Sequence, residues 1–152
     1  MMYLNMQIIW TGVTIAFYTG ILTPLMMLQM ENLDVSYEHK QSKALYAMVF
    51  LGFGEVTGAQ LNGLIIDWMG SMKTTLINIL IVIITGLITV YNLYKLEMTT
   101  WTYVMTFAWG FSDGAINCHI NQILGFEFES QSEPFCVFNF LQGIGVFMFQ
   151  MI

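Results

Sequence analysis

The chain of 152 residues has ten acids and four lysines, a formal net charge of −6 and a mean hydropathy of +0.67. Only 9% of its residues are charged, against about 25% in soluble domains, so the composition excludes an ordinary soluble domain. It has no arginine and no basic cluster, which gives nucleic-acid binding no electrostatic support. We also find no nucleophile–base pair, phosphate-binding loop or metal-ligand spacing, and therefore expect no enzyme, no cofactor and no bound metal.

Long stretches without charged residues predict an all-α membrane protein. A membrane helix needs roughly 20 mostly apolar residues. Continuous apolar stretches of that length favour helices over the shorter, alternating strands of a membrane β-barrel. We expect a single transmembrane domain, a polytopic helical bundle integral to the lipid bilayer, with about five spans. They lie at 7–29, 44–66, 74–94, 100–124 and 135–152.

The first two predicted spans differ in their polar content. Span 7–29 follows no basic stretch and is too long for the apolar core of a signal peptide, so we interpret it as a membrane helix. Span 44–66 carries the acid Glu55 halfway along its length. Small or amide side chains recur in steps of four within that span, at Gly54, Gly58 and Asn62.

The third predicted span, 74–94, has no charged residue and differs from the others in being mostly a run of Ile, Leu, Val and Thr. The glycines and polar residues concentrate in the other spans. We therefore expect span 74–94 to lie at the periphery of the bundle, exposed to lipid over much of its surface.

The fourth predicted span, 100–124, carries the acid Asp113 near its middle. At about 100° per residue, Asp113, Asn117 and Asn121 form one stripe along a helix. Two glycines fall in the same arc and form a GxxxG pair, which lets another helix approach closely: Gly110 and Gly114. His119 points away from this stripe, and we interpret it as a hydrogen-bonded or interface residue.

Glu55 and Asp113 are the acids that interrupt predicted spans near their middles. Both spans run in the same direction, so we expect the two carboxyls at one depth, near the midplane. An acid there costs about 2.5–3.5 kcal/mol on insertion scales and usually faces a cavity or a partner. No lysine or arginine of the chain lies at that depth, so each acid is either protonated or paired with a group outside residues 1–152. Packing and interhelical hydrogen bonding stay open as alternatives to a ligand or proton role.

Residues 63–73, GLIIDWMGSMK, resemble the signature loop of the major facilitator superfamily, which joins the second and third helices of a half. The family pattern is a glycine, three residues, an aspartate, two residues, a glycine and then basic residues. The positions that match are Gly63, Asp67, Gly70 and Lys73. Ser71 and Met72 stand where the family has a basic pair. The resemblance implies that this loop takes part in conformational change.

Residues 109–128, WGFSDGAINCHINQILGFEF, resemble the tenth helix of the uncoordinated-93-like branch of that superfamily. Cys118 and His119 replace a threonine and a glutamine of the branch pattern. Residues 11–26 and 132–149 are similar to the seventh and eleventh helices of the branch. The positions that match in the tenth helix are Gly110, Asp113, Asn117, Asn121 and Gly125.

The resemblance implies helices seven to eleven of a twelve-helix protein, so we expect a fragment that lacks an amino-terminal half and a last helix. It implies a secondary transporter of a small solute or ion. Its partner would be the missing half or a complementary membrane subunit. The substrate or proton sites would be Asp113, Asn117, Asn121 and Glu55. The alternative is a non-transporting accessory protein that regulates a channel or the trafficking of a receptor.

Overall fold

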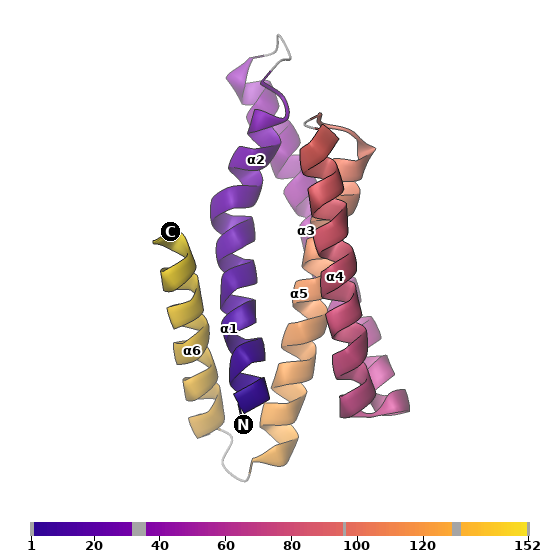
Figure 1. The fold of residues 1–152 in the computed structure, drawn as a ribbon, viewed down its shortest axis with the longest axis vertical. Coiled ribbons are helices and arrows are strands. Elements are labelled where there is room, and N and C mark those ends of the chain that lie inside the picture. Colours follow the sequence, from indigo (N-terminus) through magenta and orange to yellow (C-terminus); the bar gives the residue numbers. More distant parts are fainter. Residues whose placement is uncertain (1, 32–35, 96, 129–131, 152) are drawn as a thin grey trace.

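The computed structural model describes residues 2–31, 36–95, 97–128 and 132–151, which are helical apart from short turns and include no strand. They form five helical rods that lie side by side (Figure 1). The first rod has three parts: α1 (Met2–Ala16), the π-helix η1 (Phe17–Leu22) and α2 (Thr23–Leu28). The others are α3 (Tyr37–Met69), α4 (Ser71–Lys95), α5 (Thr100–Glu127) and α6 (Ser132–Gln150). The expectation of an all-helical bundle is confirmed.

Three described helical segments are long and apolar enough to cross a membrane: Gln7–Leu28, Tyr37–Met69 and Ser71–Lys95. They contain or closely match the first three predicted spans. Large apolar side chains are exposed along them, and Trp68 and Leu87 keep 89% and 65% of their surface uncovered. Exposed apolar surface of this extent is unusual for a soluble monomer and is compatible with a membrane location.

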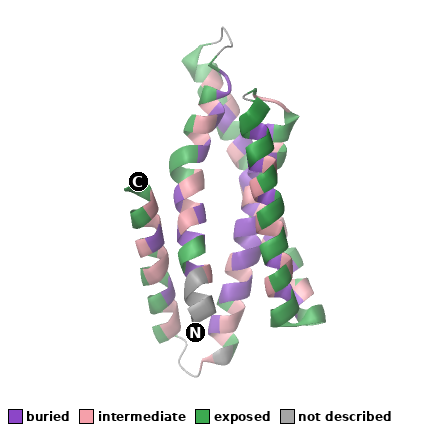
Figure 2. Ribbon diagram, in the orientation of Figure 1, coloured by how far each residue is buried: buried purple, intermediate pink, exposed green. Residues whose placement is uncertain are grey.

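The helix α4 has its polar residues inside and its apolar residues outside. Figure 2 shows exposed residues along most of its length, as expected for a peripheral helix. Its contacts are made with α5 and α3. However, the expectation that polar residues concentrate in the other helices is wrong, because the buried face of α4 is a polar stripe. It consists of Thr74, Asn78, Thr85, Thr89 and Asn92.

The first rod widens into the π-helix η1 because Pro24 follows it. A proline inside a helix has no N–H to donate and its ring clashes with the carbonyl four residues earlier, here that of Gly20. One wide π-helical turn at Phe17–Leu22 accommodates this clash without ending the rod. The rod therefore continues through α2, and Met26 of α2 and Met30 just after it pack against α3 and α5 in the larger apolar cluster of the bundle.

The backbones of α3 and α5 touch at four glycines. A Cβ on Gly54 or Gly58 would collide with the main chain of Phe107 or Phe111. On the opposite helix, a Cβ on Gly110 or Gly114 would collide with the main chain of Leu51 or Glu55. Missing side chains on both helices thus bring the two main chains into van der Waals contact, as the GxxxG pair predicted.

A second glycine contact joins α1 to α6. A Cβ on Gly12 would lie 3.0 Å from the Gly145 Cα and would also collide with the Gln142 carbonyl. A Cβ on Gly145 would lie 2.7 Å from the Ile9 carbonyl oxygen. The bundle is therefore built from two close pairs, α1 with α6 and α3 with α5, and α4 packs against the second pair.

We expect Gly114→Ala to lower the free energy of unfolding in detergent micelles by about 1–3 kcal/mol, because the added methyl group forces the α3 and α5 backbones apart. The matched control is Gly125→Ala on the same helix, where a Cβ meets nothing within 4 Å. The control should be neutral or stabilising by up to about 1 kcal/mol, since alanine is the better helix former. Equal unfolding curves for the two variants would contradict the glycine contact.

Candidate functional site

Asp113 lies at the middle of α5 and is buried, with 2% of its surface exposed. The Thr14 hydroxyl on α1 donates a hydrogen bond to its carboxylate Oδ1 at 2.8 Å. One turn further along α5, the side-chain amide of Asn117 donates to the Asp113 backbone carbonyl at 3.0 Å. The half-buried Tyr18 of η1 also lies near this carboxyl. Asp113 therefore faces the α1–η1 rod.

The Thr14 hydroxyl can serve Asp113 in two ways. Its oxygen lies 2.8 Å from Asp113 Oδ1 and also 2.8 Å from the Thr11 carbonyl oxygen, but a hydroxyl has one hydrogen to donate. With Asp113 ionised, Thr14 donates to the carboxylate. With Asp113 protonated, the carboxyl donates to Thr14 while Thr14 donates to Thr11. The site thus offers a hydrogen-bond arrangement for each protonation state.

The hydrogen bonds around Thr14 extend across the first rod to α6. The Gln142 side chain donates from Nε2 to the Thr11 hydroxyl at 3.1 Å. Thr11 in turn donates to the Ile8 carbonyl at 2.7 Å. We call Gln142, Thr11, Thr14 and Asp113 the polar bridge, because these residues connect α6, α1 and α5. The bridge links the two close helix pairs through side chains rather than through glycines.

Glu55 lies at the same level as Asp113, and both carboxyls lie near Tyr18. The Gly114 backbone lies against the main chain of Glu55, so the two acids are neighbours along the α3–α5 contact, at one depth. The Glu55 side chain, however, is exposed. The structure therefore brings the two predicted acids near each other at one level, with Asp113 buried and Glu55 exposed.

The three residues of the predicted polar stripe do not share one environment, because Asn121 differs from the other two. Asp113 is buried, Asn117 is half-buried and Asn121 is exposed. The reason is helical drift: steps of four residues turn by about 40° each, so the stripe has moved by about 80° after two steps. Asn121 thus leaves the α1-facing side of α5, and Asp113 and Asn117 remain as the buried part of the stripe.

The predicted loop motif forms the tight turn between α3 and α4. Gly70 has a φ of +80°, which favours glycine, and its N–H caps α3 by donating to the Ile66 carbonyl at 2.8 Å. Asp67 and Lys73 are exposed on the two sides of the turn, and Gly63 lies half-buried two helical turns earlier. The three-residue spacing between Asp67 and Gly70 therefore marks the end of α3.

A side-chain contact fixes this turn to α5. The Oγ of Ser71, the first residue of α4, lies 2.8 Å from the Nε2 of His119. His119 is 1% exposed. The expectation that His119 is a hydrogen-bonded residue is confirmed, and its partner lies at the position where the family motif has a basic residue.

Sequence reasoning missed the partners of Asp113, although their spacing carried a signal. Thr11, Thr14 and Tyr18 follow each other at three and four residues within an otherwise apolar span. It also missed the role of Asn62, whose side-chain amide donates to the Ala115 carbonyl at 2.7 Å across the α3–α5 contact. In each case the polar residue was visible, but the helix that it faces was not.

Within the described ranges, no group of three or more His, Cys, Asp and Glu side chains could hold a metal ion. The two cysteines, Cys118 and Cys136, are free thiols on α5 and α6. Asp113, with its hydrogen-bond partners on another helix, is therefore the candidate site that the described residues offer.

Comparison of the chain with models of protein families, with curated proteins and with solved structures gives no match. Two observations bear on function: a buried carboxyl held between α5 and the first rod, and an exposed carboxyl, Glu55, at the same level of the bundle.

We expect a double-mutant cycle between Thr14→Val and Asp113→Leu to show a coupling of about 1–3 kcal/mol in the free energy of unfolding, because each change removes one partner of the same buried hydrogen bond. The matched control is Thr19→Val. Thr19 is exposed and donates to the Ile15 carbonyl of its own rod at 2.6 Å. If the coupling energy between Thr14 and Asp113 is no larger than the coupling energy between Thr19 and Asp113, the hydrogen bond does not contribute to stability.

Proposed function

We propose that the chain is a multi-pass membrane protein in which all five helical rods cross the bilayer. The helix α5 has 28 residues and is about 42 Å long, and α6 has 19 residues and is about 29 Å long. Both lengths suit a hydrocarbon core of about 30 Å. The apolar content of α5 is diluted by polar residues such as Ser112, Asp113 and His119, but these are buried against neighbouring helices rather than facing outward.

We further propose that the bundle is the carboxy-terminal half of a major-facilitator-like fold of the uncoordinated-93-like branch. Two features support this proposal besides the sequence resemblance. The third rod, α4, packs at the edge of the α3–α5 pair, as third helices do in that fold. The motif glycine Gly70 adopts the left-handed conformation in the turn between the second and third rods.

The function that this geometry supports best is secondary transport of a small solute or ion, with Asp113 as the proton or cation site. The observation that carries the proposal is the buried carboxyl with a Thr14 partner suited to either protonation state. Transporters bind substrates and coupling ions near the midplane, where two structural repeats meet. Alternating access needs two such repeats, so the described bundle requires an amino-terminal half or a complementary subunit to transport.

A second function, that of an accessory subunit, is favoured by a different observation. Glu55 and Asn121 are exposed polar residues on a largely apolar surface, where lipid would be an unfavourable neighbour. Each would be satisfied by a polar group of a channel or receptor that the protein regulates or escorts. In this function Asp113 serves packing, and the exposed pair makes the partner contact.

The proposed topology puts the start of α3 and the α3–α4 turn on opposite sides of the membrane, because the 33 residues of α3 span about 50 Å. We expect a membrane-impermeant maleimide to label Ser36→Cys and Met72→Cys from opposite sides of sealed vesicles. The background should carry Cys118→Ala and Cys136→Ala, and Met72 is 86% exposed. Labelling of both positions from one side would contradict the topology.

The two functions predict opposite results for the two acids in the membrane-embedded protein with its other half or its partner. For a transporter, Asp113→Asn should leave folding intact and abolish the proton dependence of substrate uptake, measured in proteoliposomes with a pH-sensitive dye. For an accessory protein, Glu55→Gln should weaken co-purification of the partner, whereas Asp113→Asn should spare it. If neither variant changes uptake or association, both functional assignments are wrong.

A further inference from the structure

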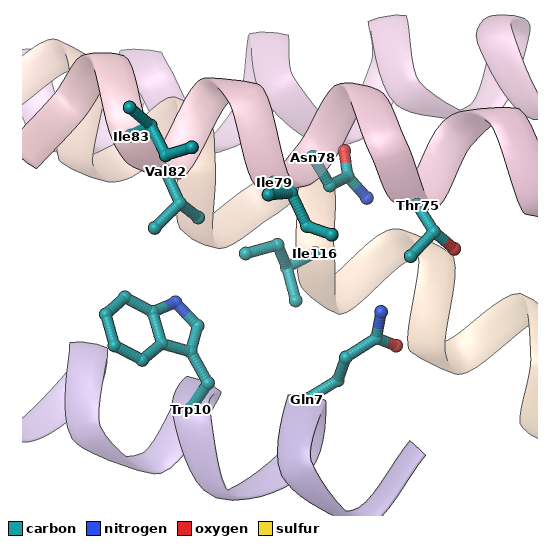
Figure 3. Close-up of a pocket in the computed structure, with 8 residues that line it drawn as sticks. All are labelled: Gln7, Trp10, Thr75, Asn78, Ile79, Val82, Ile83 and Ile116. Carbon is teal, nitrogen blue, oxygen red and sulfur yellow. The ribbon is translucent and has the colours of Figure 1, made fainter. Parts of the chain in front are cut away.

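A pocket of about 420 Å³ lies on the side of the bundle, between the first rod, α4 and α5 (Figure 3). The helix α1 contributes Gln7 and Trp10 to its lining, and α5 contributes Ile116. The remaining lining residues, which include Thr75 and Asn78, belong to α4. This volume is within the range of about 300–1,000 Å³ that holds small molecules in proteins. The pocket is distinct from the polar bridge, which joins α1 to α5 at Thr14 and Asp113.

Asn78 is the residue that marks this pocket as a binding site. It is 4% exposed, and neither its Nδ2 nor its Oδ1 has a hydrogen-bond partner within the described part of the chain. A buried amide without partners costs about 1–3 kcal/mol per unsatisfied group, so native proteins nearly always pair it. Figure 3 shows the Asn78 amide at the same end of the pocket as the Gln7 amide and the Thr75 hydroxyl. A ligand group that both accepts and donates, such as a hydroxyl, would satisfy Asn78.

The two ends of the pocket differ in polarity. In the proposed membrane location, the polar end lies nearer to the membrane surface and the apolar end lies nearer to the midplane. Helices α1 and α4 run in the same direction (Figure 1), so their polar lining residues fall at one end. On α4, Asn78 lies about 10 Å from the start of the helix at Ser71, which is nearer to the proposed membrane surface than the apolar lining residues are. Val82 and Ile83 lie about 17 Å from that start, close to the middle of the helix.

We propose that this pocket binds a neutral membrane amphiphile with a hydroxyl head group, the chemistry that a sterol and a monoacylglycerol share. Its hydroxyl would pair with Asn78, and its apolar body would lie along Trp10, Val82 and Ile83. The head group is neutral because no residue that lines the pocket is charged. The proposal rests on the bilayer location proposed above, but on neither transport nor an accessory role.

The unpaired Asn78 amide favours an amphiphile with a hydroxyl over another transmembrane helix. An apolar helix face packed over the pocket would leave both polar atoms of Asn78 without a partner. An amphiphile of one compact or single-chain body fits the space and follows its polarity.

The test uses the purified chain in phosphatidylcholine nanodiscs with photoreactive analogues of a sterol and of a monoacylglycerol. The control probe is the methyl ether of each analogue, which has lost the hydroxyl hydrogen. We expect saturable crosslinks that map to residues 7–10 and 75–83 for at least one hydroxyl probe, and the two probes identify which body the pocket prefers. The methyl ether and Asn78→Leu should each weaken labelling about tenfold, as expected for the loss of one buried hydrogen bond.

Two further variants keep the test decisive if Asn78→Leu fails to fold. Ile83→Trp fills the apolar end without touching the amides and should also weaken labelling. Asn139→Leu replaces an exposed asparagine on α6 and should leave labelling unchanged. Crosslinks spread evenly over the apolar surface, or unaffected by Ile83→Trp, would overturn the proposal. The proposal would also be overturned if no probe crosslinked and if, at the same time, the Thr75→Cys variant formed a disulfide between two copies of the chain, because a second copy would then occupy the pocket. If the topology experiment failed, the proposed bilayer location would be contradicted, and this failure is distinguishable from failure of the pocket to bind an amphiphile.

Discussion

The structure depends on the close approach of α3 and α5, whose main chains touch at Gly54, Gly58, Gly110 and Gly114. With no side chains between them, the helices share a seam that Asn62 reinforces by donating to the Ala115 carbonyl. The seam fixes the rotation of α5 about its axis and thereby turns Asp113 toward the first rod. The same close contact sets Glu55 beside Gly114 and leaves its side chain exposed. The difference between a buried and an exposed acid follows from this one packing constraint.

Polar side chains hold the rods together where glycines do not. The polar bridge connects the two close pairs at Thr14 and Asp113, and the Ser71–His119 contact ties the α3–α4 turn to α5. At the other end of α4, the Gln29 amide donates to the Asn92 side chain at 2.6 Å. The outward surface is meanwhile rich in Leu, Ile, Val and Phe. In a bilayer this distribution is favourable, because lipid contacts the apolar surface while the polar side chains named above pair with each other inside the bundle.

Much of this arrangement was predictable from the sequence, since charge-free stretches and helical spacing give the rods and the GxxxG pair gives the seam. The depth of Glu55 and Asp113 also followed, because both lie midway along their helices. Their environments did not follow, because spacing along one helix says which residues share a face but not which helix covers that face. The polar face of α4 was missed for a related reason: Thr and Asn among many Ile and Leu residues barely change the composition, although their spacing is helical.

In the proposed transporter, Asp113 is a buried carboxyl that takes up and releases a proton while it stays hydrogen-bonded to Thr14. Infrared difference spectroscopy of the chain in lipid, recorded on stepping the pH, measures this directly through the carbonyl stretch of a protonated carboxyl. We expect a reversible band that is absent in Asp113→Asn, shifted in frequency in Thr14→Val and retained in Glu55→Gln. A spectrum in which Asp113→Asn removes no band would contradict the claim and leave Asp113 as a packing residue.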